Sequence, residues 1–72
     1  MKTVLVFKTS VTGEKHIKVL KPLLNDLVNR NGYWNFDLED CDNILRVETQ
    51  SLPAPIISSL LHKNGFSCEE LH

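Results

Sequence analysis

Two segments in the middle of the chain, residues 33–39 and 44–49, alternate between apolar and polar residues after their first position. The alternating apolar residues are Trp34, Phe36, Leu38, Leu45 and Val47, and Tyr33 and Ile44 stand at the first positions. A period of two predicts strands that are buried on one face and solvated on the other. The residues between them, 40–43, read Asp-Cys-Asp-Asn, which is typical of a turn. The sequence therefore predicts a β-hairpin that needs a covering layer on one face only.

Helical periodicity on both sides of the hairpin can supply that layer. Residues 14–29 carry an apolar stripe, although Pro22 within it predicts a kink, because proline removes a backbone donor. A second helix is predicted after Pro53, which suits the first helical position, and is expected to end at Asn64-Gly65. Its predicted buried stripe consists of Ile56, Ile57, Leu60 and Leu61.

The two ends of the chain complete the order of elements. Residues 3–9 form a β-branched, apolar run typical of a buried strand, and residues 66–71 are long enough for a short final strand. The order β-α-β-β-α-β predicts an α+β fold, the ferredoxin-like sandwich, with a four-stranded antiparallel sheet and two helices on one face. With 72 residues, the chain is expected to form a single domain over 1–72. The connections 10–13, 40–43 and 64–66 should then meet at one end, where a small site is expected.

Composition excludes several classes of function. Eight Lys+Arg against nine Asp+Glu give a net charge of −1, whereas nucleic-acid binders normally carry a basic excess. No apolar run approaches the roughly 18 residues of a membrane span, and no signal peptide precedes the first strand, so a cytoplasmic protein is expected. So short a chain has little room for a deep substrate cavity, which argues against an enzyme. Cys41 and Cys68 are expected to be reduced thiols, with Cys68 packed as a small apolar residue.

The first loop, Ser10-Val-Thr-Gly-Glu-Lys-His16, and the pair Gly65-Phe66 resemble the heavy-metal-associated (HMA) domain of copper chaperones and metal-transporting ATPases. The resemblance extends to the apolar first strand and the hairpin. In that family the loop reads M-T-C-x-x-C, and its two thiolates bind a soft ion such as copper(I). Gly13 and His16 stand here at the two cysteine positions. The resemblance therefore implies an HMA-like fold that lacks the C-x-x-C metal motif.

A metal site built from other residues is one alternative to the missing C-x-x-C motif. His16, on the first helical turn, and Cys41, in the hairpin turn, are predicted at the same end of the fold, and imidazole with thiolate suits zinc or copper. Asp40, Asp42 or a second chain could complete such a site. The other interpretation of His16 and Cys41 is an exposed helix-start residue and an exposed turn residue, with no resident cofactor.

Three functions follow as hypotheses. The first is a non-catalytic binding or interaction module with a protein partner, as a monomer or weak homodimer that binds neither nucleic acid nor membrane. The second is an atypical metal-binding or trafficking protein that uses His16 and Cys41. The third is a small-ligand regulatory domain of the ACT type, which shares the element order. Such domains usually have a glycine in the first loop, and Gly13 corresponds to it loosely.

Two surfaces could bind a protein partner: a basic cluster, and an open sheet face that carries Tyr33 and Ile44. The basic cluster consists of Lys2, Lys8, Lys15, Lys18 and Lys21.

Overall fold

The computed structural model describes residues 3–28, 32–39 and 41–71. Its elements are β1 (Thr3–Thr9), α1 (Glu14–Val28), β2 (Tyr33–Asp37), β3 (Ile44–Thr49), α2 (Ala54–Lys63) and β4 (Cys68–Leu71). The predicted order is confirmed, while β2 and β4 are two residues shorter than predicted. The predicted end of the first helix near Asn29, and Asp40 in the hairpin turn, lie outside the described residues. Neither of the two described helices is long and apolar enough to cross a membrane.

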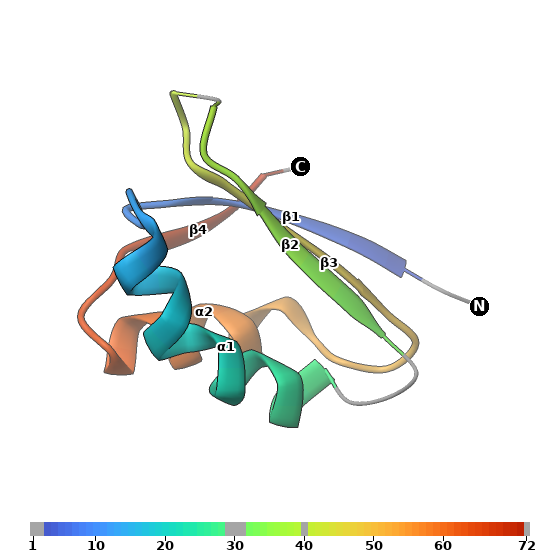
Figure 1. Ribbon diagram of the computed structural model, residues 1–72. Helices are drawn as coiled ribbons and strands as arrows, with labels where there is room; N and C mark the ends of the chain where they lie inside the picture. Colours follow the sequence, from blue (N-terminus) through green and yellow to red (C-terminus); the bar gives the residue numbers. More distant parts are fainter. Residues whose placement is uncertain (1–2, 29–31, 40, 72) are drawn as a thin grey trace.

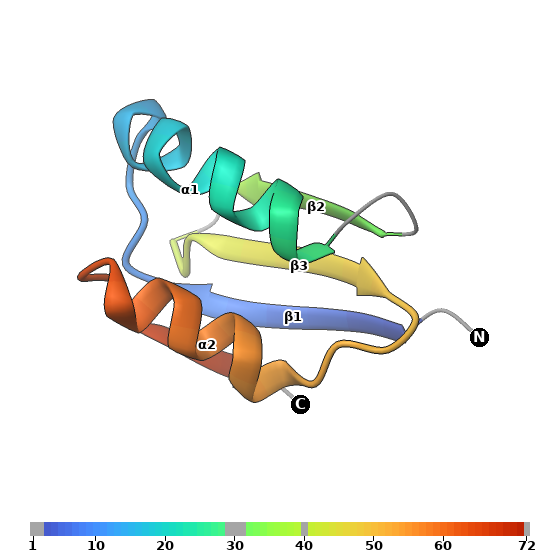
Figure 2. The same cartoon turned by 90° about the horizontal axis from the view of Figure 1, so that it is seen from below.

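The four strands form one antiparallel sheet in the order β2-β3-β1-β4. β1 lies at the centre, paired with β3 from Thr3↔Thr49 to Lys8↔Ile44 and with β4 along its second half. Both helices lie on the same face of the sheet (Figure 1, Figure 2). The fold is therefore the ferredoxin-like sandwich that the element order predicts. One helical layer suffices because the strands alternate and leave their second face to solvent.

The core lies between the helices and the inner face of the sheet. Its largest fully buried side chains are Phe7, Leu20, Leu24, Leu45, Ile57, Leu61, Val11 and Val47. The prediction that Leu45 and Val47 point inward is thus confirmed. The prediction that Ile56 is buried is wrong, since this side chain is 43% exposed, and Leu60 is only half-buried. Successive helical residues are about 100° apart, so adjacent residues cannot both face the core. Ile57 and Leu61 face the core, whereas Ile56 and Leu60 lie on the side of α2.

Helix α1 continues through Pro22, and its axis bends between the first turns and the last (Figure 1, Figure 2). The bend agrees with the predicted kink, because a proline inside a helix removes one hydrogen bond and crowds the preceding turn. Pro22 itself is exposed, whereas Leu20 and Leu24 on either side of it are fully buried. The bend therefore preserves the apolar stripe on both halves of the helix.

Helix α2 ends where the sequence predicts. Gly65 has a φ of +88°, a conformation that glycine adopts without steric cost. The N–H of Gly65 donates to the carbonyl of His62 at 3.1 Å, and the N–H of Phe66 donates to that of Leu61 at 3.0 Å. These bonds satisfy carbonyls that the end of a helix would otherwise leave free. They also turn the chain back toward β4 and place Phe66 beside the first turn of α1.

Candidate functional site

Hydrogen bonds hold the predicted loops together at one end of the sheet. The N–H of Thr9 donates to the carbonyl of Asp42 at 3.2 Å, and its Oγ1 donates to the carbonyl of Asn43 at 2.7 Å. The N–H of Ser10 donates to the carbonyl of Ser67 at 3.2 Å, and the N–H of Ser67 returns a bond to the Oγ of Ser10 at 2.9 Å. The first loop therefore contacts both the hairpin turn and the segment between α2 and β4, as the topology predicts.

The hydroxyl of Thr9 is central to this arrangement and yields a testable prediction. Thr9 is buried, and its Oγ1 also accepts the N–H of Val11 at 3.2 Å. Thr9→Val keeps the shape of the side chain but removes the partner of the buried N–H of Val11 and of the half-buried carbonyl of Asn43. We expect the free energy of unfolding to fall by about 1–3 kcal/mol, measured by urea denaturation. The same change at exposed Thr3 should alter it by less than about 0.5 kcal/mol, and equal effects at both positions would contradict this role.

His16 is half-buried and makes two contacts within the fold. Its ring meets that of Phe66 edge to face, with 5.0 Å between the centroids. Its Nδ1 accepts the backbone N–H of Thr12 at 3.4 Å. A neutral imidazole that accepts at Nδ1 carries its proton on Nε2, so in this tautomer neither ring nitrogen presents a free lone pair to a metal ion. These contacts give His16 a structural role at the start of α1.

Cys41 is exposed in the hairpin turn, and the neighbouring Asp42 carboxylate lies 3.6 Å from the Nζ of Lys8. Within residues 3–28, 32–39 and 41–71, no three His, Cys, Asp or Glu side chains gather closely enough to hold a metal ion. Gly13, which the resemblance aligns with the first cysteine of the HMA motif, offers no side-chain donor. These residues do not fit a two-thiolate copper centre. A site at His16 and Cys41 would need further ligands and remains a prediction.

The two cysteines are both free thiols in very different surroundings. Cys68 is buried and belongs to the apolar core, as predicted. Burial raises the pKa of the Cys68 thiol, and a side-chain hydrogen bond with Ser58 partly opposes that rise. Because thiolate is the reactive form, iodoacetamide should alkylate exposed Cys41 first and reach Cys68 only when the domain opens. Mass spectrometry of each peptide checks this order, and equal rates at the two thiols would contradict the burial of Cys68.

The raised pKa of Cys68 also predicts a pH dependence of stability. In the unfolded chain this thiol ionises near its ordinary pKa of about 8.5, while in the folded protein it stays protonated to higher pH. The folded state thus binds more protons above that pH, and its stability must fall as the pH rises through the alkaline range. Urea denaturation at pH 7 and pH 10 measures this effect. The free energy of unfolding should fall less between the two pH values for Cys68→Ala than for the wild-type chain. An equal loss in both proteins would contradict the assignment.

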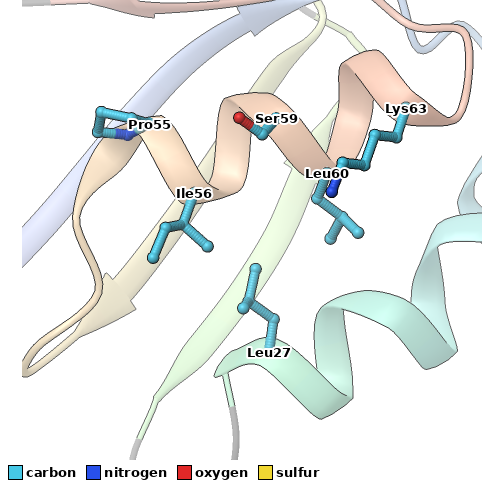
Figure 3. A pocket seen from close by; sticks show the side chains of 6 residues that line it. All are labelled: Leu27, Pro55, Ile56, Ser59, Leu60 and Lys63. Atoms are coloured by element: carbon cyan, nitrogen blue, oxygen red, sulfur yellow. The ribbon is translucent and has the colours of Figure 1, made fainter.

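A groove of about 380 Å³ runs between α1 and α2 on the outer side of the helix layer. Figure 3 shows Leu27 of α1 pointing toward α2, where Ile56 and Leu60 project into the same space. Pro55, Ser59 and Lys63 complete the lining. The groove forms because Ile56 and Leu60 lie on the flank of α2 and α1 does not close over them. Helical periodicity assigns Ile56 and Leu60 to the core, so the sequence does not predict this surface.

Two further hollows border β2 on the side of α1. One is lined by Asn25, Val28, Gly32, Tyr33 and Trp34, and the Nε1 of Trp34 donates to the Oδ1 of Asn25 across it at 2.9 Å. The other is lined by Glu14, Ile17, Asn35, Phe36, Asp37, Leu38, Glu39 and Arg46. Together they follow the gap between α1 and the outer strand of the sheet.

Neither predicted docking surface has the form that the sequence suggests. Lys8 lies on the sheet beside Asp42, whereas the basic residues Lys15, Lys18 and Lys21 lie exposed on α1, and Lys2 lies outside the described residues. The basic cluster of the sequence is therefore not one surface. On the open sheet face Tyr33 is 56% exposed, but Ile44 is buried between its register partners Lys8 and Asp37.

Comparison with models of known protein families, with curated proteins and with solved structures finds no match for this chain. The ferredoxin-like topology is shown by the strand order itself. Many unrelated functions share this fold, so function must be argued from the surfaces described above.

Proposed function

We propose that this chain is a small, non-catalytic binding module whose groove between α1 and α2 receives apolar side chains of a protein partner. The observation that carries the proposal is the exposure of Ile56, 43%, in a groove where Leu27 and Leu60 are also partly open. Apolar patches rimmed by polar side chains are typical of interaction sites. Among the described residues that line the groove, Lys63 alone is charged. A partner with an apolar segment and a carboxylate at the Lys63 end would therefore fit best.

The shape of the groove favours a polypeptide over a small ligand. Small-molecule sites usually enclose most of the ligand surface within a cavity. Here the lining comes from the flanks of two neighbouring helices, and the space between them opens on the surface of the molecule (Figure 3). Such a groove suits a segment that brings its own apolar side chains and remains partly in solvent.

Selection of short random peptides displayed on phage tests this proposal. Peptides enriched on the wild-type chain should include a group that loses at least about tenfold in affinity for Ile56→Lys. Val4→Lys is the matched control, because Val4 is 51% exposed and lies on the opposite face of the sheet. That variant should bind the same group of peptides unchanged. The groove is overturned as a binding site if every enriched peptide responds to both changes equally or to neither.

A second candidate function is atypical metal binding by an HMA-like protein, supported by the bonds from Thr9 to Asp42 and Asn43, which join the first loop to the hairpin turn that carries Cys41. Titration of the reduced protein with copper(I) and zinc against a competing chelator tests it. Sub-micromolar binding that His16→Ala or Cys41→Ala abolishes would support the metal function. Weak binding that neither substitution changes would exclude it.

A further inference from the structure

In the part of the chain that the structure describes, no strand pairs with the outer edge of β2. β2 is the first strand in the order β2-β3-β1-β4 and, among the described strands, pairs only with β3. Edge strands expose backbone N–H and C=O groups, and proteins usually block them with lysine, proline, a bulge or a very short strand. The five residues Tyr33–Asp37 include neither lysine nor proline, and their register with β3 is regular. The opposite edge, β4, has four residues and carries Glu69 and Glu70.

The inner face of this edge is also incompletely covered. Trp34 and Phe36 point toward the helices but are only half-buried, and so is Leu38 just beyond the strand. Their neighbours on β3, Leu45 and Val47, are fully buried. The two hollows between α1 and β2 lie beside these half-buried side chains. An extended chain laid along β2 would place every second side chain over them, because side chains alternate along a strand.

The charge at this edge indicates which kind of extended segment would bind along β2. Among the described residues, the hollow near the end of β2 is lined by the exposed carboxylates of Glu14, Asp37 and Glu39 and by the guanidinium of Arg46. These described side chains together carry a net charge of 1 − 3 = −2. Opposite charges across neighbouring strands are favourable and like charges are not. The added segment should carry Lys or Arg at this end.

We propose that the β2 edge is a site of strand addition, which binds an extended segment of another protein in which apolar and basic side chains alternate. Backbone hydrogen bonds to β2 would supply the affinity. The apolar side chains would cover Trp34, Phe36 and Leu38, and a basic side chain would face Asp37 and Glu39. This site is separate from the groove between the helices.

The test uses the full chain with Ile56→Lys, which closes the helix groove, so that its outcome does not depend on the proposed function. Short random peptides displayed on phage are selected on this variant. The enriched peptides should alternate apolar residues with Lys or Arg. Their binding should shift the fluorescence of Trp34, the single tryptophan of the chain, and the amide NMR signals of Tyr33–Asp37. Methylation of alternate backbone amides in the peptide should reduce affinity at least about tenfold.

Charge reversal at the two edges supplies the matched control. Asp37→Lys should weaken the selected peptides at least about tenfold, while Glu69→Lys on β4 should change affinity by less than about twofold. The proposal is overturned if no peptide is enriched, if the moved signals belong to Cys68–Leu71, or if both reversals have equal effects. Dimerisation through β2, seen by sedimentation and abolished by Asp37→Lys, would also overturn it in favour of a second copy.

Discussion

Phe7→Ala is expected to lower the free energy of unfolding by about 3–5 kcal/mol, enough to unfold much of a domain of this size at ordinary temperature. Phe7 is 0% exposed and lies on the central strand β1, opposite Leu45 of β3 and Glu70 of β4. Its removal leaves a cavity between the sheet and both helices, which the surrounding backbone can fill only in part. Loss of the cooperative transition in thermal or urea denaturation measures the effect.

Val4→Ala on the same strand is the matched control. Val4 is 51% exposed on the open face of the sheet, so its truncation removes side-chain atoms that already contact water. We expect a change below about 1 kcal/mol. Comparable losses for Phe7→Ala and Val4→Ala would show that the open face is covered by something in solution, and would contradict the single-layer arrangement.

Gly32→Ala should destabilise the protein by about 3 kcal/mol, at the upper end of the usual cost of overpacking. A Cβ at this position would collide with the Cγ1 of Val28 and lie 2.7 Å from the carbonyl oxygen of Glu48. The carbonyl belongs to the backbone of β3 and cannot move without shifting the sheet. The cost should therefore appear as a lower urea midpoint, and also as a disturbed environment of Trp34, which lines the same hollow.

Gly13→Ala separates this crowding from the general effect of replacing a glycine. A Cβ at Gly13 meets no atom within 4 Å. The substitution should be neutral or stabilise the protein by up to about 1 kcal/mol, because alanine restricts the unfolded chain. If Gly13→Ala and Gly32→Ala destabilised the protein equally, crowding at Gly32 would not be the cause.

Much of the fold was predictable because the relevant signals are local. The alternation around Phe36 and Val47 predicts a hairpin with one buried face, and the Asn64-Gly65 pair predicts the end of α2. Once the order of elements is known, few topologies remain, and the meeting of the first loop with the hairpin turn follows. The hydrogen bonds of Thr9 agree with that expectation.

The surfaces that could bind a partner were much less predictable. Ile56 and Ile57 are adjacent and chemically identical, yet one is 43% exposed and the other fully buried. The sequence assigns both to one apolar stripe, because it does not contain the spacing of the two helices. The hollows beside β2 were likewise not predicted, since they depend on how closely α1 approaches the outermost strand.

By itself the sequence determined the element order, the hairpin and the inward direction of Leu45 and Val47, because these follow from periodicity along the chain. The topology that follows from the element order also places the strand of Tyr33 and Trp34 at an edge of the sheet, as the strand order confirms. Only the tertiary structure decided which apolar side chains remain exposed. Their exposure depends on distances between elements far apart in the sequence, and no local pattern encodes it. The groove at Ile56 is therefore a finding of the structure alone.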